Sequence, residues 1–349
     1  MGRKRVRELG INIGELETGK YNSITDVYGI IVGHKTIIDN EVASGLTVIM
    51  PNEGKLDGCH FPAGVFRFNG TGEFTGYHWI KETGTLVSPI VFTGSHLLGL
   101  THRYLTLATR KIKGLEPFSM GVVGETWDGW LSDLEKTVIE YKDLEEAILS
   151  AKSGVTEEGN VGGGTGMIAF EFKGGIGTSS RIINCNGIEY TIGAIVQSNF
   201  GKRKDFIIEG ETIGRIIDED KVPLPWSTNK NSSSLLVTIA TDAPLTSSQC
   251  ERVSKRATLA MARLGSIGEE SSGDFFLTFS TGNKYSYDNE QFNSIKMIQI
   301  EELDKVFQGA VEAVTEAIVN SITMAETMEG QKGRKAYELP LDTLKAIFH

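Results

Sequence analysis

The chain has 349 residues, of which 40% are hydrophobic and 23% charged, so its composition is that of a folded globular protein and excludes a disordered chain. Its 45 acidic and 35 basic side chains give a formal net charge of −10, which argues against general nucleic-acid binding because that needs a basic face. Glycine, with 41 residues, makes up about 12% of the chain against an average of about 7%, and this excess indicates many turns and close backbone contacts.

The sequence contains no run of about 18 apolar residues, so we expect no membrane-spanning segment. No apolar stretch of signal-peptide type follows the basic cluster at residues 3–7, which we interpret as a solvated N-terminal arm. The three cysteines are odd in number and far apart, and neither they nor the six histidines have metal-ligand spacing. We therefore expect a reduced, cytoplasmic protein that needs no metal and no cofactor.

Strand patterns and helical patterns are mixed in the first half of the chain. The clearest strand has Leu46, Val48 and Met50 on one face, and apolar residues recur every three or four positions through 130–151, which predicts one long helix. We expect strands at 29–34, 44–50 and 121–124, and helices beginning near Tyr77 and covering 96–110 and 130–151.

The second half begins with the densest glycine stretch, residues 159–177, and contains a polar segment at 227–234 that predicts an exposed loop. Ser248 and Glu251 have the spacing of a capping box, and Gly265 suits the end of the helix that they begin. We expect strands at 167–172, 188–196, 235–240 and 275–280, and helices at 248–264, 301–327 and 341–348. Because strands and helices do not strictly alternate, the pattern favours an α+β layered domain.

The segment VGGGTGM at residues 161–167 is a candidate binding loop, because glycine-rich turns expose N–H groups that can hold phosphate. It resembles the GGGTG loop of tubulin-like GTPases. It lacks the Lys-Ser/Thr pair of a P-loop, however, and it continues into a strand-like run instead of a helix. The competing interpretation is a tight inter-strand turn with close backbone packing, so nucleotide binding stays open as an alternative.

A second candidate is the serine run at residues 232–234, which directly precedes the sequence LLVTIATDAPL. A serine between a loop and a buried strand usually has no special role. If the chain is cut just before Ser234, however, its hydroxyl and a new α-amine belong to the same residue. That amine has an ordinary pKa of about 7.7–8.0, so it can accept the hydroxyl proton at neutral pH without a histidine.

At these residues the sequence resembles the self-processing L-aminopeptidase/D-esterase family, which includes the β-peptidyl aminopeptidases. The shared features are a serine, an apolar strand ending in ATDAPL, a helix rich in Arg and Ala, and Ser-Gly-Asp before a strand ending in Phe-Ser-Thr. Further motifs follow the family order over nearly the whole chain: ITDVYGIIVGH, NGTGEFTG, GETWDGWLSDL, GNVGGGTGM with FKGGIGTSSR, and VQSNFG. The related ornithine acetyltransferases use threonine as nucleophile, so a serine favours hydrolysis.

The resemblance implies a four-layer αββα sandwich of the N-terminal-nucleophile type, built as one domain from residues 1–349. Ser234 matches the family nucleophile, so cleavage would fall between Ser233 and Ser234 and give an α chain of residues 1–233 and a β chain of residues 234–349. The mature enzyme would hydrolyse short peptides, amino-acid amides and esters from their amino end through an acyl-enzyme. Relatives assemble as homo-oligomers of αβ units, and we expect no nucleic-acid or membrane partner.

The resemblance also assigns roles to residues outside the cleavage site. Ser272 and Asp274 match a serine and an acidic residue that support the nucleophile and its amine, and Asn199 matches an asparagine whose amide helps to form the oxyanion hole. Trp127 falls where some relatives have tyrosine, so we interpret its indole as a pocket wall. Glu125 is the best candidate to hold the α-ammonium of the substrate, because an aminopeptidase needs an anion there. Each residue also has a structural interpretation, as a turn former, a strand-edge carboxylate or a core aromatic.

Residue 233 is where the sequence departs from the family, because relatives commonly have glycine or asparagine before the nucleophile. Self-cleavage needs a strained peptide bond that the hydroxyl of Ser234 can attack, and the loss of glycine's freedom at Ser233 would slow it. A binding protein that keeps the fold and never cleaves itself is therefore a second alternative, besides nucleotide binding.

Overall fold

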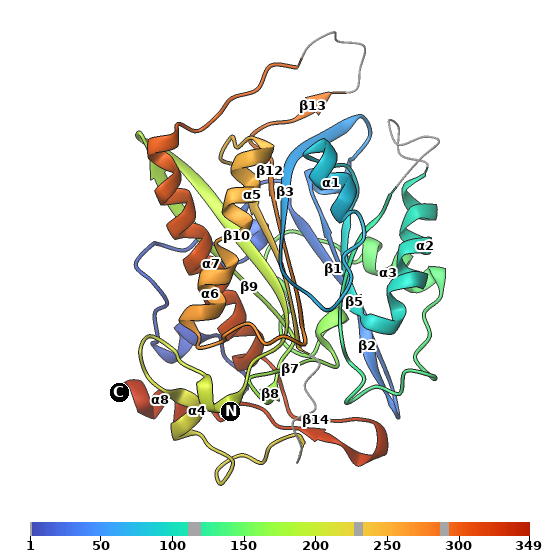
Figure 1. Ribbon diagram of the computed structural model, residues 1–349, viewed down its shortest axis with the longest axis vertical. Helices are drawn as coiled ribbons and strands as arrows, with labels where there is room; N and C mark the ends of the chain where they lie inside the picture. Colours follow the sequence, from blue (N-terminus) through green and yellow to red (C-terminus); the bar gives the residue numbers. More distant parts are fainter. Residues whose placement is uncertain (1, 111–119, 227–232, 287–292) are drawn as a thin grey trace.

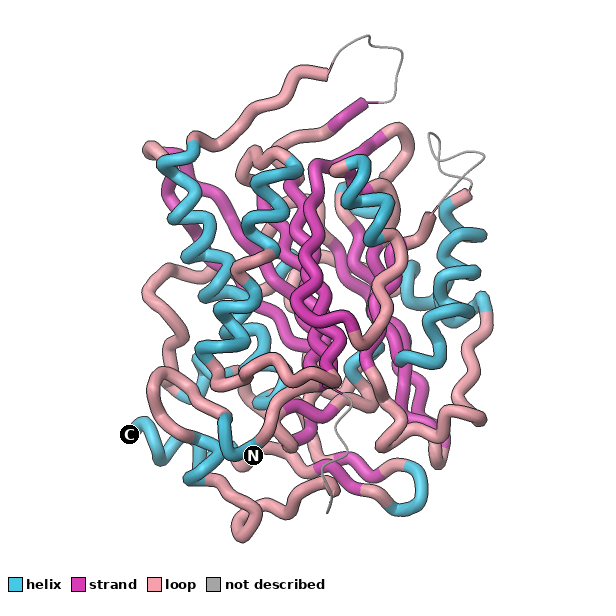
Figure 2. Tube along the Cα trace, viewed as in Figure 1, coloured by secondary structure: helices cyan, strands magenta, loops and turns pink. Residues whose placement is uncertain are grey.

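The computed structural model describes residues 2–110, 120–226, 233–286 and 293–349, which form a four-layer sandwich (Figure 1). Two sheets face each other in the centre, and helices cover the outer face of each sheet (Figure 2). The predicted α+β class and the αββα order of layers are confirmed.

The larger sheet has seven strands in the order β13-β3-β12-β11-β10-β9, with β4 paired to β3. Its neighbouring strands are antiparallel, except that β11 and β12 run parallel and therefore begin at the same edge of the sheet. The strands are β3 Cys59–Gly70, β4 Thr85–Leu86, β9 Ile176–Cys185, β10 Ile188–Asn199, β11 Ser233–Thr241, β12 Ser272–Ser280 and β13 Tyr285–Ser286.

The smaller sheet has the order β1-β2-β5-β6, and its β5 and β6 also run parallel. Two short hairpins, β7-β8 and β14-β15, lie outside both sheets. The bounds of these strands are β1 Ile31–Asp39, β2 Val42–Met50, β5 Ile90–Gly94, β6 Val122–Thr126, β7 Ile168–Ala169, β8 Phe172–Lys173, β14 Met328–Glu329 and β15 Lys335–Ala336.

Helices α5, α6 and α7 belong to the layer on the larger sheet, whereas α2 and α3 cover the smaller one. The α-helices are α1 Tyr77–Thr83, α2 Leu98–Thr109, α3 Tyr141–Leu149, α4 Ile213–Ile216, α5 Ser247–Ser254, α6 Ala257–Arg263, α7 Leu303–Thr323 and α8 Leu341–Phe348. Short 3-10 segments lie at Val6–Leu9, Ile24–Asp26, Asn52–Gly54, Ser95–Leu97, Gly162–Gly164, Arg203–Asp205, Ile300–Glu302 and Gln331–Gly333.

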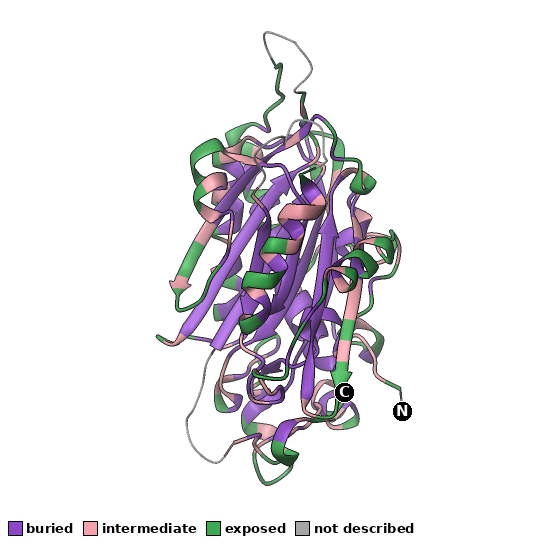
Figure 3. Cartoon of the chain, turned by 90° about the vertical axis from the view of Figure 1, so that its right-hand side faces the viewer, coloured by how far each residue is buried: buried purple, intermediate pink, exposed green. Residues whose placement is uncertain are grey.

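The central strands are buried on both faces, because one face meets the other sheet and the opposite face meets helices (Figure 3). Leu236 of β11 and Phe275 of β12 belong to the same buried cluster as Ile49 and Phe92 of the smaller sheet. All nine residues of β2, which was expected to have two distinct faces, are likewise buried. The apolar runs in these strands therefore follow from their position in the middle of four layers.

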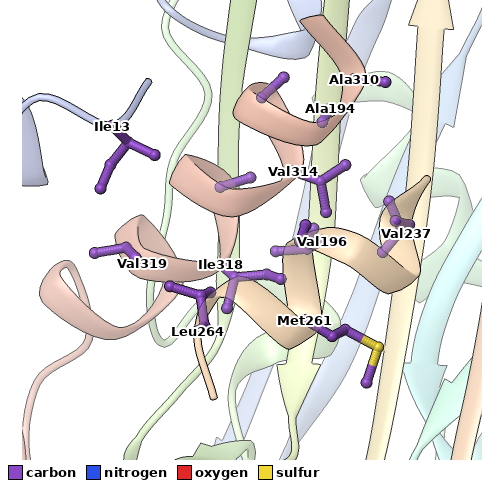
Figure 4. Packing of buried hydrophobic residues seen from close by; sticks show 14 of the residues in the cluster. Ile13, Ala194, Val196, Val237, Met261, Leu264, Ala310, Val314, Ile318 and Val319 are labelled. Atoms are coloured by element: carbon purple, nitrogen blue, oxygen red, sulfur yellow. The ribbon is translucent and has the colours of Figure 1, made fainter. Parts of the chain in front are cut away.

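Helix α7 provides the core between the larger sheet and its helical layer. Its Val314 and Ile318 belong to the same buried cluster as Val196 of β10, Val237 of β11 and Met261 of α6 (Figure 4). Most of α7 is buried, because the N-terminal segment also packs against it. Truncating a fully buried isoleucine in such a core costs about 2–5 kcal/mol of stability.

Several predicted elements differ from the structure at their boundaries. Of the helix predicted at 130–151 only α3 is helical, because Leu131 belongs to one buried cluster and Leu144 to another, with turns between them. Thr246, and not Ser248, caps α5 through a capping box with Gln249. The predicted helix at 248–264 is divided into α5 and α6, and the strand predicted at 167–172 is the β7-β8 hairpin.

The N-terminal cluster at residues 3–7 is not a solvated arm, so that interpretation was wrong. Arg5 forms an ion pair with Glu158 at 2.6 Å, and Arg7 forms one with the fully buried Glu316 at 2.7 Å. The guanidinium of Arg5 also donates to main-chain carbonyls. When the N-terminal segment packs against α7 and β9, each guanidinium gains a carboxylate partner and carbonyl partners. These contacts hold the segment in place.

Within the described ranges, no helix is both long and apolar enough to cross a bilayer. The same part of the chain contains no cluster of three His, Cys, Asp or Glu side chains that could hold a metal ion. The three cysteines are free and buried.

Candidate active site

Three strands of the larger sheet meet at one edge, where β11 and β12 begin and β10 ends. In the strand register Ser234 lies opposite Asn199 on one side and opposite Gly273 on the other, and Ser233 lies opposite Ser272. The backbone hydrogen bonds of the sheet therefore bring together residues that are far apart in the sequence.

The hydroxyl of Ser234 lies beside the carbonyl of the preceding residue. Its Oγ donates a hydrogen bond to the carbonyl oxygen of Ser233 at 2.6 Å. Both residues are buried in β11, so the prediction of an exposed loop at 227–234 is wrong for these two, and residues 227–232 lie outside the described residues. The attacking oxygen is thus already next to the carbonyl of the peptide bond that we expect to be cut.

Asp274 of β12 is connected to this serine pair through Ser272. Its Oδ1 accepts a hydrogen bond from Ser272 Oγ at 2.8 Å, and its Oδ2 accepts one from Asn69 Nδ2 at 2.8 Å. The Oγ of Ser272 also lies 3.3 Å from the Oγ of Ser233. Burial raises the pKa of Asp274 to about 6, although the hydrogen bonds that it accepts favour the charged form.

The side-chain amide of Asn199 is held in one orientation. Its Oδ1 accepts a hydrogen bond from the Ile168 N–H at 2.9 Å, and its Nδ2 donates to the carbonyl oxygen of Trp127 at 3.0 Å. An N–H on one side and a carbonyl on the other fix which atom is oxygen and which is nitrogen. Among the described residues the second N–H of Nδ2 has no hydrogen-bond partner, so it is a candidate donor to an oxyanion beside Ser234.

Glu125 comes from β6 of the smaller sheet and approaches the same edge from the opposite layer. Its carboxylate accepts hydrogen bonds from the N–H of Glu73 at 2.8 Å and from the hydroxyl of Ser95. A Cβ at Gly72 would lie 2.8 Å from Glu125 Oε1 and 3.3 Å from the Cα of Gly273, so the carboxylate lies close to β12 and a larger residue at 72 would displace it. Burial raises the pKa of Glu125, and a bound ammonium would lower it again.

Trp127 meets the candidate site through its main chain. Its carbonyl accepts the amide of Asn199, which the sequence did not reveal. Its half-buried indole lies over Gly129, where an added Cβ would come within 2.6 Å of the indole Nε1. The ring therefore packs against the turn at Gly129, and its interpretation as a pocket wall stays a prediction.

The GGGTG segment does not cradle a phosphate in this fold. The N–H groups of Gly162 and Gly163 donate to the hydroxyls of Thr36 and Thr47 at 2.9 and 3.1 Å. A Cβ at Gly163 would lie 2.2 Å from Gln197 Oε1, so the segment is packed against β10 without a gap. These glycines serve close backbone packing, and the nucleotide-binding alternative is wrong for this reason.

Sequence reasoning missed Asn69 and Ser95, which hold the carboxylates of Asp274 and Glu125. Asn69 opens the NGTGEFTG turn, so its place in that motif was a usable signal. Ser95 follows the apolar strand β5 directly, and no local pattern marks it.

The family model of peptidase family S58 matches residues 22–336. The β-peptidyl aminopeptidase BapA of Sphingosinicella xenopeptidilytica is 38% identical over 98% of this chain and 90% of that protein. A solved β-aminopeptidase of a Burkholderia species matches with a TM-score of 0.92 and 38% identity, over 99% of this chain and 98% of that chain. The L-aminopeptidase D-Ala-esterase/amidase of Ochrobactrum anthropi matches with a TM-score of 0.91 and 37% identity, over 99% of this chain and 98% of that chain. Its structure is described as a prototype for the serine aminopeptidases and as a new variant of the Ntn-hydrolase fold.

Proposed function

Because this chain belongs to peptidase family S58, and is an aminopeptidase with the Ntn-hydrolase fold, we propose that it is made as an inactive precursor that cuts itself between Ser233 and Ser234. The products are an α chain of residues 1–233 and a β chain of residues 234–349. The observation that carries this proposal is the 2.6 Å hydrogen bond from Ser234 Oγ to the carbonyl oxygen of Ser233.

Self-cleavage proceeds by an N→O acyl shift. The Oγ of Ser234 attacks the carbonyl carbon of Ser233, its proton passes to the leaving amide nitrogen, and the C–N bond breaks to give an ester. Water then hydrolyses the ester, which leaves a carboxylate on Ser233 and a free α-amine on Ser234. Asn199 donates to the oxyanion that forms in each step.

In the mature enzyme the same serine attacks the substrate. The Oγ of Ser234 adds to the carbonyl carbon of the bond to be cut, and the free α-amine of Ser234 accepts the hydroxyl proton and passes it to the leaving amine. Water releases the acyl group in a second step. The Ser272–Asp274 pair accepts hydrogen bonds from the α-amine and holds it next to Oγ.

The substrate is a short peptide, amino-acid amide or ester with a free amino group. The buried carboxylate of Glu125 recognises the substrate by pairing with its ammonium group. The relatives are named for β-peptidyl, L-amino-acid and D-alanyl substrates, which share this free amino group. We propose that αβ units assemble into a homo-oligomer. We also propose that the protein works in the reducing cytoplasm, because its three cysteines are free.

Denaturing gel electrophoresis tests self-cleavage directly. We expect two bands of about 25 and about 13 kDa, in proportion to the 38.1 kDa of the whole chain. Edman sequencing of the smaller band should give a sequence that begins at Ser234. A single 38 kDa band after prolonged incubation would instead support the alternative of a binding protein that never cleaves.

Replacing the nucleophile has the largest effect of any single change. Ser234→Ala should abolish both the cleavage and the hydrolysis of aminoacyl p-nitroanilides. The matched control is Ser198→Ala in the neighbouring strand β10, because Ser198 is also a buried serine and its hydroxyl has no hydrogen-bond partner within the described structure. Residual turnover in Ser234→Ala, or an equal loss in Ser198→Ala, would contradict the assignment.

A further inference from the structure

Lys173, the last residue of β8, is a buried cation whose partners are all main-chain carbonyls. Its Nζ donates to the carbonyl oxygens of Gly174 at 2.6 Å, Met167 at 2.8 Å and Gly164 at 3.4 Å, and the side chain is fully buried. It forms no ion pair with a described carboxylate. Burying an unpaired ammonium is costly, and burial alone lowers the pKa of Lys173 to about 7. The ammonium form, which has three N–H groups for the three carbonyls, therefore predominates below about pH 7.

The carbonyl of Met167 connects this cation to the candidate oxyanion hole. It belongs to the same peptide group as the Ile168 N–H, and that N–H donates to Asn199 Oδ1 at 2.9 Å. The Gly174 N–H donates to the same carbonyl at 3.0 Å. A continuous path of hydrogen-bonded amides therefore runs from Lys173 Nζ through the 167–168 peptide to the side-chain amide of Asn199.

The β7-β8 hairpin that contains this path has an unfavourable turn. Phe170 and Glu171 form the turn with φ angles of 49° and 60°, a region that glycine and asparagine occupy far more easily. The ring of Phe170 stacks on Phe206 with centroids 4.4 Å apart, and the Phe170 N–H donates to the Phe200 carbonyl at 2.7 Å. Such backbone strain persists only where the surroundings fix it, and it is concentrated at functional sites.

We propose that Lys173 is a positioning residue of the oxyanion hole, which orients and polarises the 167–168 peptide and, through it, the amide of Asn199. Hydrogen bonds in a chain strengthen one another, so a cation at the carbonyl end makes the Ile168 N–H a stronger donor to Oδ1. Polarised at Oδ1, the amide of Asn199 becomes a stronger donor at Nδ2, where the oxyanion forms. This inference rests on the proposed role of Asn199.

The test replaces the cation by a neutral side chain of similar length, Lys173→Met, in the full chain. The rate of self-cleavage and the kcat and KM for an aminoacyl p-nitroanilide are measured per molecule of cleaved enzyme. We expect kcat to fall about tenfold and KM to stay within about twofold, because a weaker oxyanion donor acts on the transition state. Lys173→Gln keeps a neutral donor and should lower kcat by less. This second variant keeps the proposal testable if Lys173→Met does not fold.

The matched control is Arg203→Met. Arg203 is also a buried cation that donates to main-chain carbonyls, those of Val222 and of Glu171 in the turn of the same hairpin, but among the described residues it has no hydrogen bond to Asn199 or Ile168, so it controls for disturbance of the hairpin alone. Both variants should lower the unfolding temperature, but only Lys173→Met should lower kcat per cleaved molecule. An equal fall of kcat in the two variants, or an unchanged kcat in Lys173→Met, would overturn the proposal.

A double-mutant cycle separates this inference from the function on which it rests. If Lys173 acts through Asn199, then Lys173→Met should change kcat by less than about twofold in an Asn199→Ala background. A tenfold loss that persists in that background would refute the relay. If Asn199→Ala alone leaves kcat unchanged, the proposed oxyanion hole itself fails, and that result is distinct from the failure of Lys173.

Discussion

The two sheets of the sandwich contribute different kinds of residue to the candidate site. The larger sheet holds Ser234, Asn199 and Asp274, the residues proposed for the chemistry, on three strands whose relative positions are set by backbone hydrogen bonds. The smaller sheet contributes Glu125, whose place in β6 is set by pairing with β5 and whose carboxylate is held by the Glu73 N–H and the Ser95 hydroxyl. The residues proposed for the chemistry and the residue proposed for recognition therefore belong to different sheets, so recognition should be able to change without disturbing the chemistry. Substitutions in the larger sheet should lower kcat, and those in the smaller sheet should raise KM.

The strongest test in the larger sheet, short of removing the nucleophile, is Asp274→Asn. The uncharged amide accepts a weaker hydrogen bond from the Ser272 hydroxyl than the carboxylate does. The Ser272 hydroxyl, and the α-amine that this hydroxyl orients, are then held less firmly. We expect kcat to fall about 100-fold, within the range found for acid–base groups, with KM nearly unchanged. Steady-state kinetics measures both constants. A change confined to KM would break the distinction between the two sheets.

The same carboxylate predicts the acid limit of activity. The pKa of Asp274 is raised to about 6 from an ordinary 3.8, so the group becomes protonated as the pH falls through 6 and the supporting charge is lost. The α-amine of Ser234, with an ordinary pKa of about 7.7–8.0, must also be uncharged, so we expect kcat to fall in two steps with falling pH and only the step near pH 6 to be absent in Asp274→Asn. A step near pH 6 that persists in the variant would assign that titration to another group.

Stability responds in the opposite direction to activity. Because the folded-state pKa of Asp274 lies above its unfolded value, the folded chain holds this proton more tightly, and the stability from Asp274 is lost as the pH rises from 3.8 to 6. The test compares two uncleaved chains, Ser234→Ala and the double variant Ser234→Ala/Asp274→Asn. When the pH rises from 4.5 to 7, the free energy of unfolding of the chain that keeps Asp274 should fall by about 2 kcal/mol more than that of the double variant. Urea unfolding at the two pH values measures this difference, and a constant gap would contradict it.

In the smaller sheet the informative change is Glu125→Gln, which keeps the shape of the side chain and removes its charge. The loss of an ammonium–carboxylate pair should raise KM about tenfold or more, with little effect on kcat. N-acetylated amides provide the control, since they lack the ammonium. The variant should discriminate less between free and acetylated substrates, and an unchanged ratio would remove Glu125 from recognition.

Much of the fold followed from the sequence, because long apolar patterns such as those of β10, β11 and α7 determine the element type. The failures have local causes. The β7-β8 hairpin turns at Phe170 and Glu171, which are not turn residues, and tertiary packing overrides their preference. The break between residue 130 and α3 was hidden, because apolar residues of two different clusters happen to have helical spacing.

For the site, family motifs selected residues that the structure brings to one edge of the sheet, although their roles stay predictions. What the motifs could not provide is the second layer of contacts. Lys173 lies in the quoted motif FKGGIGTSSR, but only its position below the 167–168 peptide suggests a role. Ser95 and Asn69 likewise depend on which carboxylate each one meets in three dimensions.

The smallest expected effect concerns Ser233, which belongs to the larger sheet but has no part in the proposed turnover. Ser233→Gly restores the residue common in the family, gives the cleaved peptide more backbone freedom and removes a hydroxyl that lies 3.3 Å from Ser272 Oγ. We expect self-cleavage, followed on gels, to accelerate by a factor of about two to five, since the change is worth less than about 1 kcal/mol, and kcat of the cleaved enzyme to stay the same. Ser233→Ala separates the two causes, because it removes only the hydroxyl. A slower cleavage in Ser233→Gly would contradict the expected gain from backbone freedom. An altered kcat of the cleaved enzyme would mean that Ser233 also acts in turnover, so that the residues used in the chemistry would extend across the cleavage site.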